Sequence, residues 1–159
     1  MTDYYKDRLE KGLEYQDFVC DRLRQMNPAR IILPYCSRKY QHEYGESGGG
    51  YEIKLDTRIR ETGNIYIEVA EKSDPDNPEF VRSGIWRDDN TVYWLIGDYE
   101  EAFLFSKRQL QMLCASGRED YRQKNGIRRR ETPTSIAYTF PLEFVRKGGY
   151  CLETFNFRK

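Results

Sequence analysis

The chain has 159 residues, and its 26 basic and 26 acidic side chains give a formal net charge of +0, a length that suits one compact domain. The balanced charge argues against a protein that works by non-specific electrostatic attraction to nucleic acid, but it leaves open a local basic groove around an acidic site. Without an apolar run of about 20 residues, a signal-peptide pattern or a CxxC pair, and with one histidine, we expect a cytoplasmic protein with free thiols and no zinc.

The first predicted element is an amphipathic helix over residues 3–26, which Asn27-Pro28 ends. On a helical wheel, with roughly 100° between successive residues, the apolar side chains lie on one broad face. That face consists of Tyr5, Leu9, Leu13, Gln16, Val19, Cys20, Leu23 and Met26. Gln16 therefore points inward, either as a functional amide or as one that bonds a neighbouring loop. Gly12 costs about 1 kcal/mol relative to alanine within a helix, which suggests the close approach of another backbone.

A short apolar strand at 31–35 and a polar, glycine-rich loop at 36–50 lead into two strands, at 50–56 and 64–72. Both strands alternate polar and apolar residues, which is the pattern of a pleated surface. Thr62-Gly63-Asn64 between them is turn chemistry. The pair is therefore predicted to be an antiparallel hairpin.

The second half of the chain continues the mixture of strands and helices. A strand at 91–96 is apolar enough to be central, and the next strand is its expected hairpin partner. The elements are expected at 91–96 (strand), 102–106 (strand), 107–115 (helix), 135–140 (strand), 141–146 (helix) and 150–157 (strand or tail). Residues 118–130 form a polar, basic run that predicts a solvated loop, or a phosphate contact in a nucleic-acid enzyme.

Charges within the predicted hairpin are the unusual feature of this sequence. Glu52, Lys54 and Asp56 share one face of the first strand, and Glu68 and Lys72 share one face of the second. Carboxylates held close together repel one another unless a cation or a hydrogen-bond network stabilises them. One acidic residue from each strand, with a lysine nearby, is the set that can hold a divalent metal. Alternatively, Glu52 and Lys54 form a simple ion pair on an exposed sheet.

The order of helix, strand, acidic hairpin and strand resembles the PD-(D/E)XK nuclease superfamily, and the loop Gln41-x-x-x-Gly45-Glu46 resembles that of its small phage-associated members. The residues that carry the resemblance are Gly12-x-x-Tyr15-Gln16-x-x-Val19-x-x-x-Leu23, Glu52-Ile-Lys-Leu-Asp56 and Ile67-Glu68-Val-Ala70. The resemblance implies an α/β fold: a single domain with a restriction-endonuclease-like core (αβββαβ) and a central mixed sheet flanked by helices. That core would span about residues 3–115, followed by a C-terminal extension at about 116–159.

The resemblance also implies roles for individual residues. Asp56 and Glu68 would be the ligands of Mg²⁺ or Mn²⁺, and Gln16 would position a water molecule or the metal shell. Ala70 stands where the family has its lysine, so Lys72 is the candidate replacement and Lys54 the alternative. Glu46, in the loop before the first strand, is an additional candidate.

The expected substrate is DNA, whose phosphodiester bonds the enzyme would hydrolyse, as a monomer or as a homodimer. Candidate contacts to the DNA backbone are Lys39, Arg58, Arg128, Arg129 and Arg130. The competing hypothesis is an inactive nuclease fold that serves as a nucleic-acid-binding or protein-binding module, because Ala70 and Gln16 both depart from an active pattern. A third hypothesis is a small interaction protein whose acidic hairpin contacts a basic partner.

Overall fold

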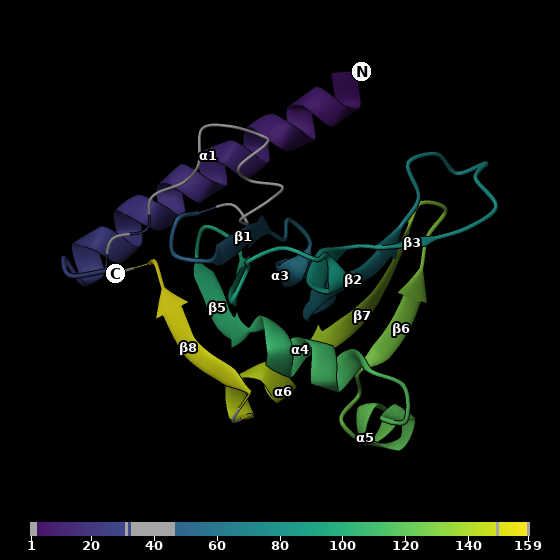
Figure 1. The fold of residues 1–159 in the computed structure, drawn as a ribbon. Helices are drawn as coiled ribbons and strands as arrows, with labels where there is room; N and C mark the ends of the chain where they lie inside the picture. The colour runs from purple at the N-terminus through teal and green to yellow at the C-terminus, as the bar shows by residue number, and fades with distance from the viewer. Residues whose placement is uncertain (1–2, 31, 33–46, 149, 159) are drawn as a thin grey trace. The chain divides into compact units, whose positions relative to one another are not determined.

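The computed structural model describes residues 3–30, 32, 47–148 and 150–158, with the backbone alone at 3–5. In this part of the chain helices alternate with two four-stranded sheets, so the predicted α/β class is confirmed (Figure 1). The strand orders are β1-β4-β5-β8 and β3-β2-β7-β6. None of the described helices is long and apolar enough to cross a membrane.

The chain divides into two compact units. The first unit comprises residues 1–57, 89–104 and 153–159, and the second comprises residues 58–88 and 105–152. Residues 116–159 supply strands to both sheets. The single domain with an endonuclease-like core at 3–115 stays a prediction.

The first unit contains one long helix and most of one sheet. Its elements are α1 (Asp3–Met26), β1 (Tyr51–Leu55), β4 (Tyr93–Gly97), and parts of β5 (Glu101–Ser106) and β8 (Cys151–Asn156). β1 pairs with β4 in parallel, and β4 and β5 run antiparallel because three residues connect them. The core collects the following side chains: Tyr15, Val19, Cys20, Leu23, Ile32, Ile53, Leu95, Ala102, Leu104, Phe155 and Phe157.

The predicted helix and the predicted central strand are both confirmed in this unit. α1 has the expected bounds, and Gln16 is buried on its inner face. β4 lies between β1 and β5, and Trp94, Leu95 and Ile96 along it are buried. Gly12 differs from the expectation, because a Cβ added there meets nothing within 4 Å among the described residues. No backbone of the described chain therefore requires a glycine at this position.

The second unit contains the other sheet with several short helices. Its elements are α3 (Ile59–Thr62), β2 (Asn64–Glu71), β3 (Val81–Arg82), η1 (Gly84–Trp86), α4 (Lys107–Cys114), α5 (Glu119–Lys124), β6 (Arg128–Glu131), β7 (Ser135–Pro141) and α6 (Leu142–Lys147). β2 pairs antiparallel with β3 and β7, and β6 pairs antiparallel with β7. Buried side chains of β2 and β7, among them Ile65, Ile67 and Phe140, face the core.

The hairpin predicted for residues 50–72 is wrong, because β1 and β2 belong to different sheets. The turn residues between them have another task. Gly63 adopts the left-handed conformation (φ 64°) and ends α3, where its N–H donates to the carbonyl of Ile59. Turn chemistry that suits a hairpin also suits the end of a helix. The two strands are therefore free to pair with distant partners.

The loop predicted for residues 118–130 is also wrong, because this run folds as α5 and then as the edge strand β6. Arg122 explains the difference. Its side chain is only 5% exposed, and its guanidinium donates to the carbonyls of Leu113 and Ala115 at 2.8 and 2.7 Å. The same group lies 4.7 Å from the ring centroid of Tyr138. A charged side chain thus anchors the segment by capping the end of α4.

Candidate functional site

A groove in the first unit runs between α1 and β1 and holds two of the predicted site residues. Its volume is about 270 Å³. The lining residues are Arg8, Leu9, Lys11, Gly12, Leu13, Gln16, Ile53, Lys54, Leu55 and Thr57. Gln16 and Lys54 are far apart in the sequence and meet here because the inner face of α1 packs on β1. The open space beside Gly12 is part of the same groove.

Cations gather around this groove. Arg8, Lys11 and Lys54 all line it, and no acidic side chain does so among the described residues. The ammonium of Lys11 pairs with exposed Asp7 at 2.8 Å. A cluster of cations over a partly apolar floor suits an anionic ligand that also presents a flat or apolar surface, such as a nucleotide strand.

Lys54 forms the ion pair with Glu52 that one of the sequence hypotheses predicts, but the exposed sheet of that hypothesis is wrong, because the Glu52 side chain is buried. Its ammonium lies 2.7 Å from Oε1 of Glu52, whose side chain is 1% exposed. The same ammonium lies 5.9 Å from the ring centroid of Trp94. Glu52 therefore fixes the position of Lys54 at the edge of the groove.

Asp56 follows β1 directly and is half-buried. Its N–H donates to the carbonyl of Gly97 at 2.8 Å, which continues the parallel pairing by one residue. Because Leu55 is paired with Gly97, Asp56 and Asp98 stand at the same carboxyl edge of two parallel strands. Ligands of α/β proteins commonly bind at this kind of edge.

Asp98 is a residue of this edge that the sequence analysis missed. Its Oδ1 accepts hydrogen bonds from the N–H groups of Glu100 and Glu101, both at 2.9 Å. This is ordinary turn chemistry, and the sequence pattern predicts nothing more than a turn. The usable signal was that an aspartate stands at or just beyond the end of each of two predicted strands.

Tyr15 lies close to both aspartates. Its hydroxyl donates to the backbone carbonyl of Asp98 at 3.2 Å. Burial raises the pKa of the Tyr15 hydroxyl, and the negative charges of Asp98, Tyr99 and Asp56 raise it further. The hydroxyl therefore stays protonated over the whole physiological pH range and can keep its hydrogen bond to Asp98.

Glu68, in the second unit, is held by a chain of hydroxyl groups. Ser83 Oγ donates to Oε1 at 2.8 Å, and Ser135 Oγ donates to Oε2 at 3.1 Å. Ser135 has one hydroxyl proton, so the Tyr66 hydroxyl is the donor in its 2.9 Å contact with Ser135 Oγ. The carboxylate of Glu68 is thus oriented from both sides.

The backbone around Glu68 is constrained as well. The pairing of β2 with β7 shifts register between Glu68 and Ala70, which marks a β-bulge. Gly84 packs against this point with φ 54°, and a Cβ there would lie 2.2 Å from the Glu68 carbonyl oxygen. Bulges are common beside functional sites because they redirect side chains.

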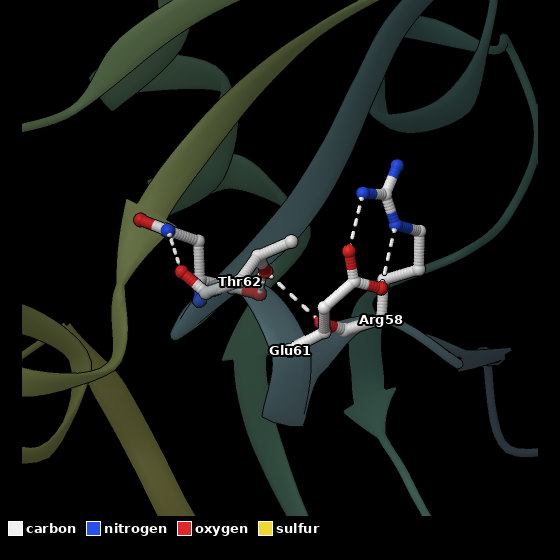
Figure 2. Close-up of polar contacts among 4 residues, drawn as sticks. Arg58, Glu61 and Thr62 are labelled. Atoms are coloured by element: carbon white, nitrogen blue, oxygen red, sulfur yellow. Dashed lines mark hydrogen bonds and ion pairs between the residues drawn. The ribbon is translucent and has the colours of Figure 1, made fainter.

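Two further predicted residues of the second unit have partners close in sequence. The ammonium of Lys72 lies 4.3 Å from the ring centroid of Phe80. The guanidinium of Arg58 makes two contacts with Glu61, at 2.9 and 3.3 Å, beside the start of α3 (Figure 2). Both side chains are therefore held by their own segments.

The three predicted arginines form most of β6. Arg128, Arg129 and Arg130 are all exposed. Lys39 and Glu46 lie outside the described residues.

The predicted metal ligands, Asp56 and Glu68, belong to the first and second unit respectively. Among the described residues, no three side chains of His, Cys, Asp or Glu come together in a group that could hold a metal ion. The chemistry of the two predicted ligands suits Mg²⁺, because both are carboxylates with hard oxygen atoms. Each carboxylate oxygen of Glu68 accepts one hydrogen bond from a serine hydroxyl and keeps a lone pair that could bind a cation.

Thiol chemistry is disfavoured for two of the cysteines. Burial raises the pKa of the Cys20 thiol to about 11 and that of Cys114 to about 12. A nucleophilic cysteine needs the opposite shift. The cysteines of the described part of the chain, Cys20, Cys114 and Cys151, form no disulfide.

Comparison with known proteins adds no relative to this picture. No protein-family model matches the chain, and no curated protein or solved structure is detectably similar to it. The functional argument therefore depends on the residues themselves.

Proposed function

We propose that this protein is a metal-dependent nuclease that hydrolyses phosphodiester bonds in DNA. The observation that carries the proposal is the basic groove of the first unit, where Gln16 and Lys54 meet. Asp56 follows directly on the strand that forms one wall of this groove. An anionic strand bound to the three cations would thus lie beside the strand that ends at a carboxylate.

The residues of the groove have distinct tasks in this proposal. Arg8 and Lys11 neutralise phosphates of the bound strand. The amide of Gln16 cannot take up a proton at neutral pH, so it orients a water molecule or a phosphate oxygen by hydrogen bonding. Lys54, held by Glu52, supplies a fixed positive charge that stabilises negative charge developing on the scissile phosphate.

Asp56 and Glu68 are the proposed oxygen ligands of Mg²⁺ or Mn²⁺, and this assignment rests on the sequence motif. A bound divalent ion supplies Lewis acidity and lowers the pKa of a coordinated water. Ser83 and Ser135 keep the Glu68 carboxylate in one orientation, which reduces the entropy cost of binding a cation. The proposal includes a cytoplasmic location.

A second candidate function is nucleic-acid binding without catalysis. Both lysines that could replace the family lysine have other partners: Lys72 contacts the Phe80 ring, and Lys54 pairs with Glu52. With Ala70 at the usual position, the chain would bind DNA through the groove and leave it intact.

Calorimetry with Mg²⁺ and Mn²⁺ tests the metal requirement. We expect binding by the wild-type protein and loss of binding in Asp56→Asn and Glu68→Gln. Glu79→Gln is the matched control, because it removes one negative charge from an exposed residue. A wild-type protein that binds neither metal contradicts the nuclease proposal.

Incubation with linear, circular and branched DNA then separates the two candidates. Cleavage that requires the metal, and that disappears in Asp56→Asn, supports the nuclease. DNA binding without cleavage under all metal conditions supports the binding module. Lys54→Ala and Lys72→Ala test the two candidate lysines, because loss of the catalytic one lowers the cleavage rate by more than the measured loss of DNA affinity explains.

A further inference from the structure

The register of the second sheet places two of the three β6 arginines in rows with residues of β2. Arg130 pairs with Ala137, and Ala137 pairs with Glu68. Arg128 pairs with Thr139, and Thr139 pairs with Tyr66. Residues directly opposite each other on neighbouring strands point to the same side of a sheet. Arg128 and Arg130 therefore share the face of the sheet that carries Glu68.

Arg129 points to the other face because side chains alternate along a strand. It pairs with Tyr138, which in turn pairs with the buried Ile67. Its guanidinium forms an ion pair with Glu131 at 2.8 Å. Within the described part of the chain, Arg128 and Arg130 have no carboxylate partner. The three neighbouring arginines thus differ in the face of the sheet to which they point and in whether they form an ion pair with a carboxylate of the described chain.

The face shared with Glu68 is polar and carries hydroxyl groups as well as the two cations. Tyr66 and Ser135 form the hydroxyl chain to Glu68, and Thr139 Oγ1 donates to the carbonyl of Arg128 at 3.2 Å. Ala137 is the small residue between Glu68 and Arg130. Two strand spacings separate that pair, or roughly 10 Å between backbones, a distance that the long arginine side chain shortens.

We propose that this face of the β3-β2-β7-β6 sheet binds the sugar-phosphate backbone of a DNA strand, with Arg128 and Arg130 on phosphates that flank the position next to Glu68. The planar guanidinium matches the geometry of phosphate oxygens, and hydroxyl groups donate to the same acceptors. Among the described residues, the large exposed hydrophobic side chains, which a protein partner would favour, lie outside β6 and β7, with Val81 on β3 at the opposite edge of the sheet. The inference rests on the proposed function only in assigning Glu68 to the reaction site.

The test is equilibrium binding of a fluorescent oligonucleotide, single-stranded and then duplex, in EDTA so that no metal-dependent cleavage occurs. Arg128→Gln and Arg130→Gln should each raise Kd by roughly tenfold, the loss expected for a charge-assisted hydrogen bond. Each should also reduce the slope of log K against log salt by about 1. Arg129→Gln, which removes the same charge from the same strand, should change Kd less than about twofold, since it loses no phosphate contact.

Circular dichroism melts establish that all three variants are folded. Equal effects of the three substitutions, or no DNA binding by the wild-type protein, overturn the inference. Displacement of the DNA by polyglutamate as effectively as by unlabelled DNA also overturns it, because the face would then recognise acidic chains in general. The predicted arginine pattern without any cleavage in Mg²⁺ keeps the inference and contradicts only the nuclease proposal. Cleavage in Mg²⁺ without the predicted arginine pattern keeps the nuclease proposal and contradicts the inference.

Discussion

The ammonium of Lys54 lies 2.7 Å from a carboxylate oxygen of Glu52, and the Glu52 side chain is almost fully buried. Glu52 and Lys54 are two residues apart in β1, so both side chains lie on the same face of the strand. A buried carboxylate that loses a neighbouring cation loses compensation for its charge, and this loss costs more free energy than the intact pair contributes. Lys54 therefore has a structural task in addition to the catalytic one proposed for it.

We predict that Lys54→Met lowers the free energy of unfolding by about 2 kcal/mol, below the range for fully buried pairs because Lys54 is partly exposed. The double variant Glu52→Gln, Lys54→Met should recover most of that loss, since it removes both charges of the pair. Urea denaturation of the two variants and the wild type measures both effects. Additive losses in the double variant would show that the pair does not stabilise the fold as a unit.

Gly84 offers a second test, because it has left-handed backbone geometry and packs against Glu68. Gly84→Ala should destabilise the protein by more than about 3 kcal/mol, since backbone strain adds to a clash with the Glu68 carbonyl. Gly117→Ala is the matched control. Gly117 has φ 76° with nothing within 4 Å of an added Cβ in the described chain, so it should lose only about 1 kcal/mol from strain. Similar losses in thermal or urea unfolding would contradict the close contact.

Gly12→Ala should have opposite effects on stability and on binding. Alanine in a helix is more stable than glycine by about 1 kcal/mol, and the described chain leaves space for the added methyl group. The same methyl group narrows the groove between α1 and β1, so DNA affinity should fall. Thermal melts and oligonucleotide binding measure the two effects. Ala29→Gly, a change of one methyl group outside α1, is a control for binding, and equal affinities of all three proteins would separate the groove from DNA recognition.

Alkaline pH should destabilise the protein through Tyr15. Its pKa is raised in the folded state, mainly by burial. The unfolded chain therefore loses this proton first, at a pKa of about 10. Stability from this group is complete below that pH and falls by about 1.4 kcal/mol per pH unit above it.

Tyr15→Phe removes both the proton and the hydrogen bond to Asp98. We expect a loss of about 1 kcal/mol at pH 7 and a smaller decline of stability between pH 10 and pH 11 than in the wild type. Urea unfolding at several pH values gives both numbers. An unchanged alkaline slope would show that other groups, such as the buried Cys20 thiol, cause the decline.

Local patterns in the sequence predicted most elements of this protein but only part of their faces, because Leu9, Leu13 and Met26 of the predicted apolar face of α1 are exposed. The 3.6-residue periodicity predicted α1 with its observed bounds and turned Gln16 inward. Alternation and β-branched residues located β1, β2, β4, β5 and β7. These signals are readable because each depends on residues close together in the chain.

Apart from the pairing of β4 with β5, which the sequence predicted, tertiary structure decided which strands pair and so which charged residues meet. Alternation specifies the face of a strand but not its neighbour, and the turn at Gly63 serves a helix end as well as a hairpin. The pairing of β1 with β4 places Asp98 beside Asp56, and the pairing of β2 with β7 and β6 places Arg130 on the face of Glu68. Arg122 likewise orders the basic segment through contacts with α4 that no local pattern contains. These contacts join residues that are far apart in the sequence, and they form together when the whole chain buries its apolar side chains. Local sequence patterns do not contain this information, so these neighbours could not be predicted.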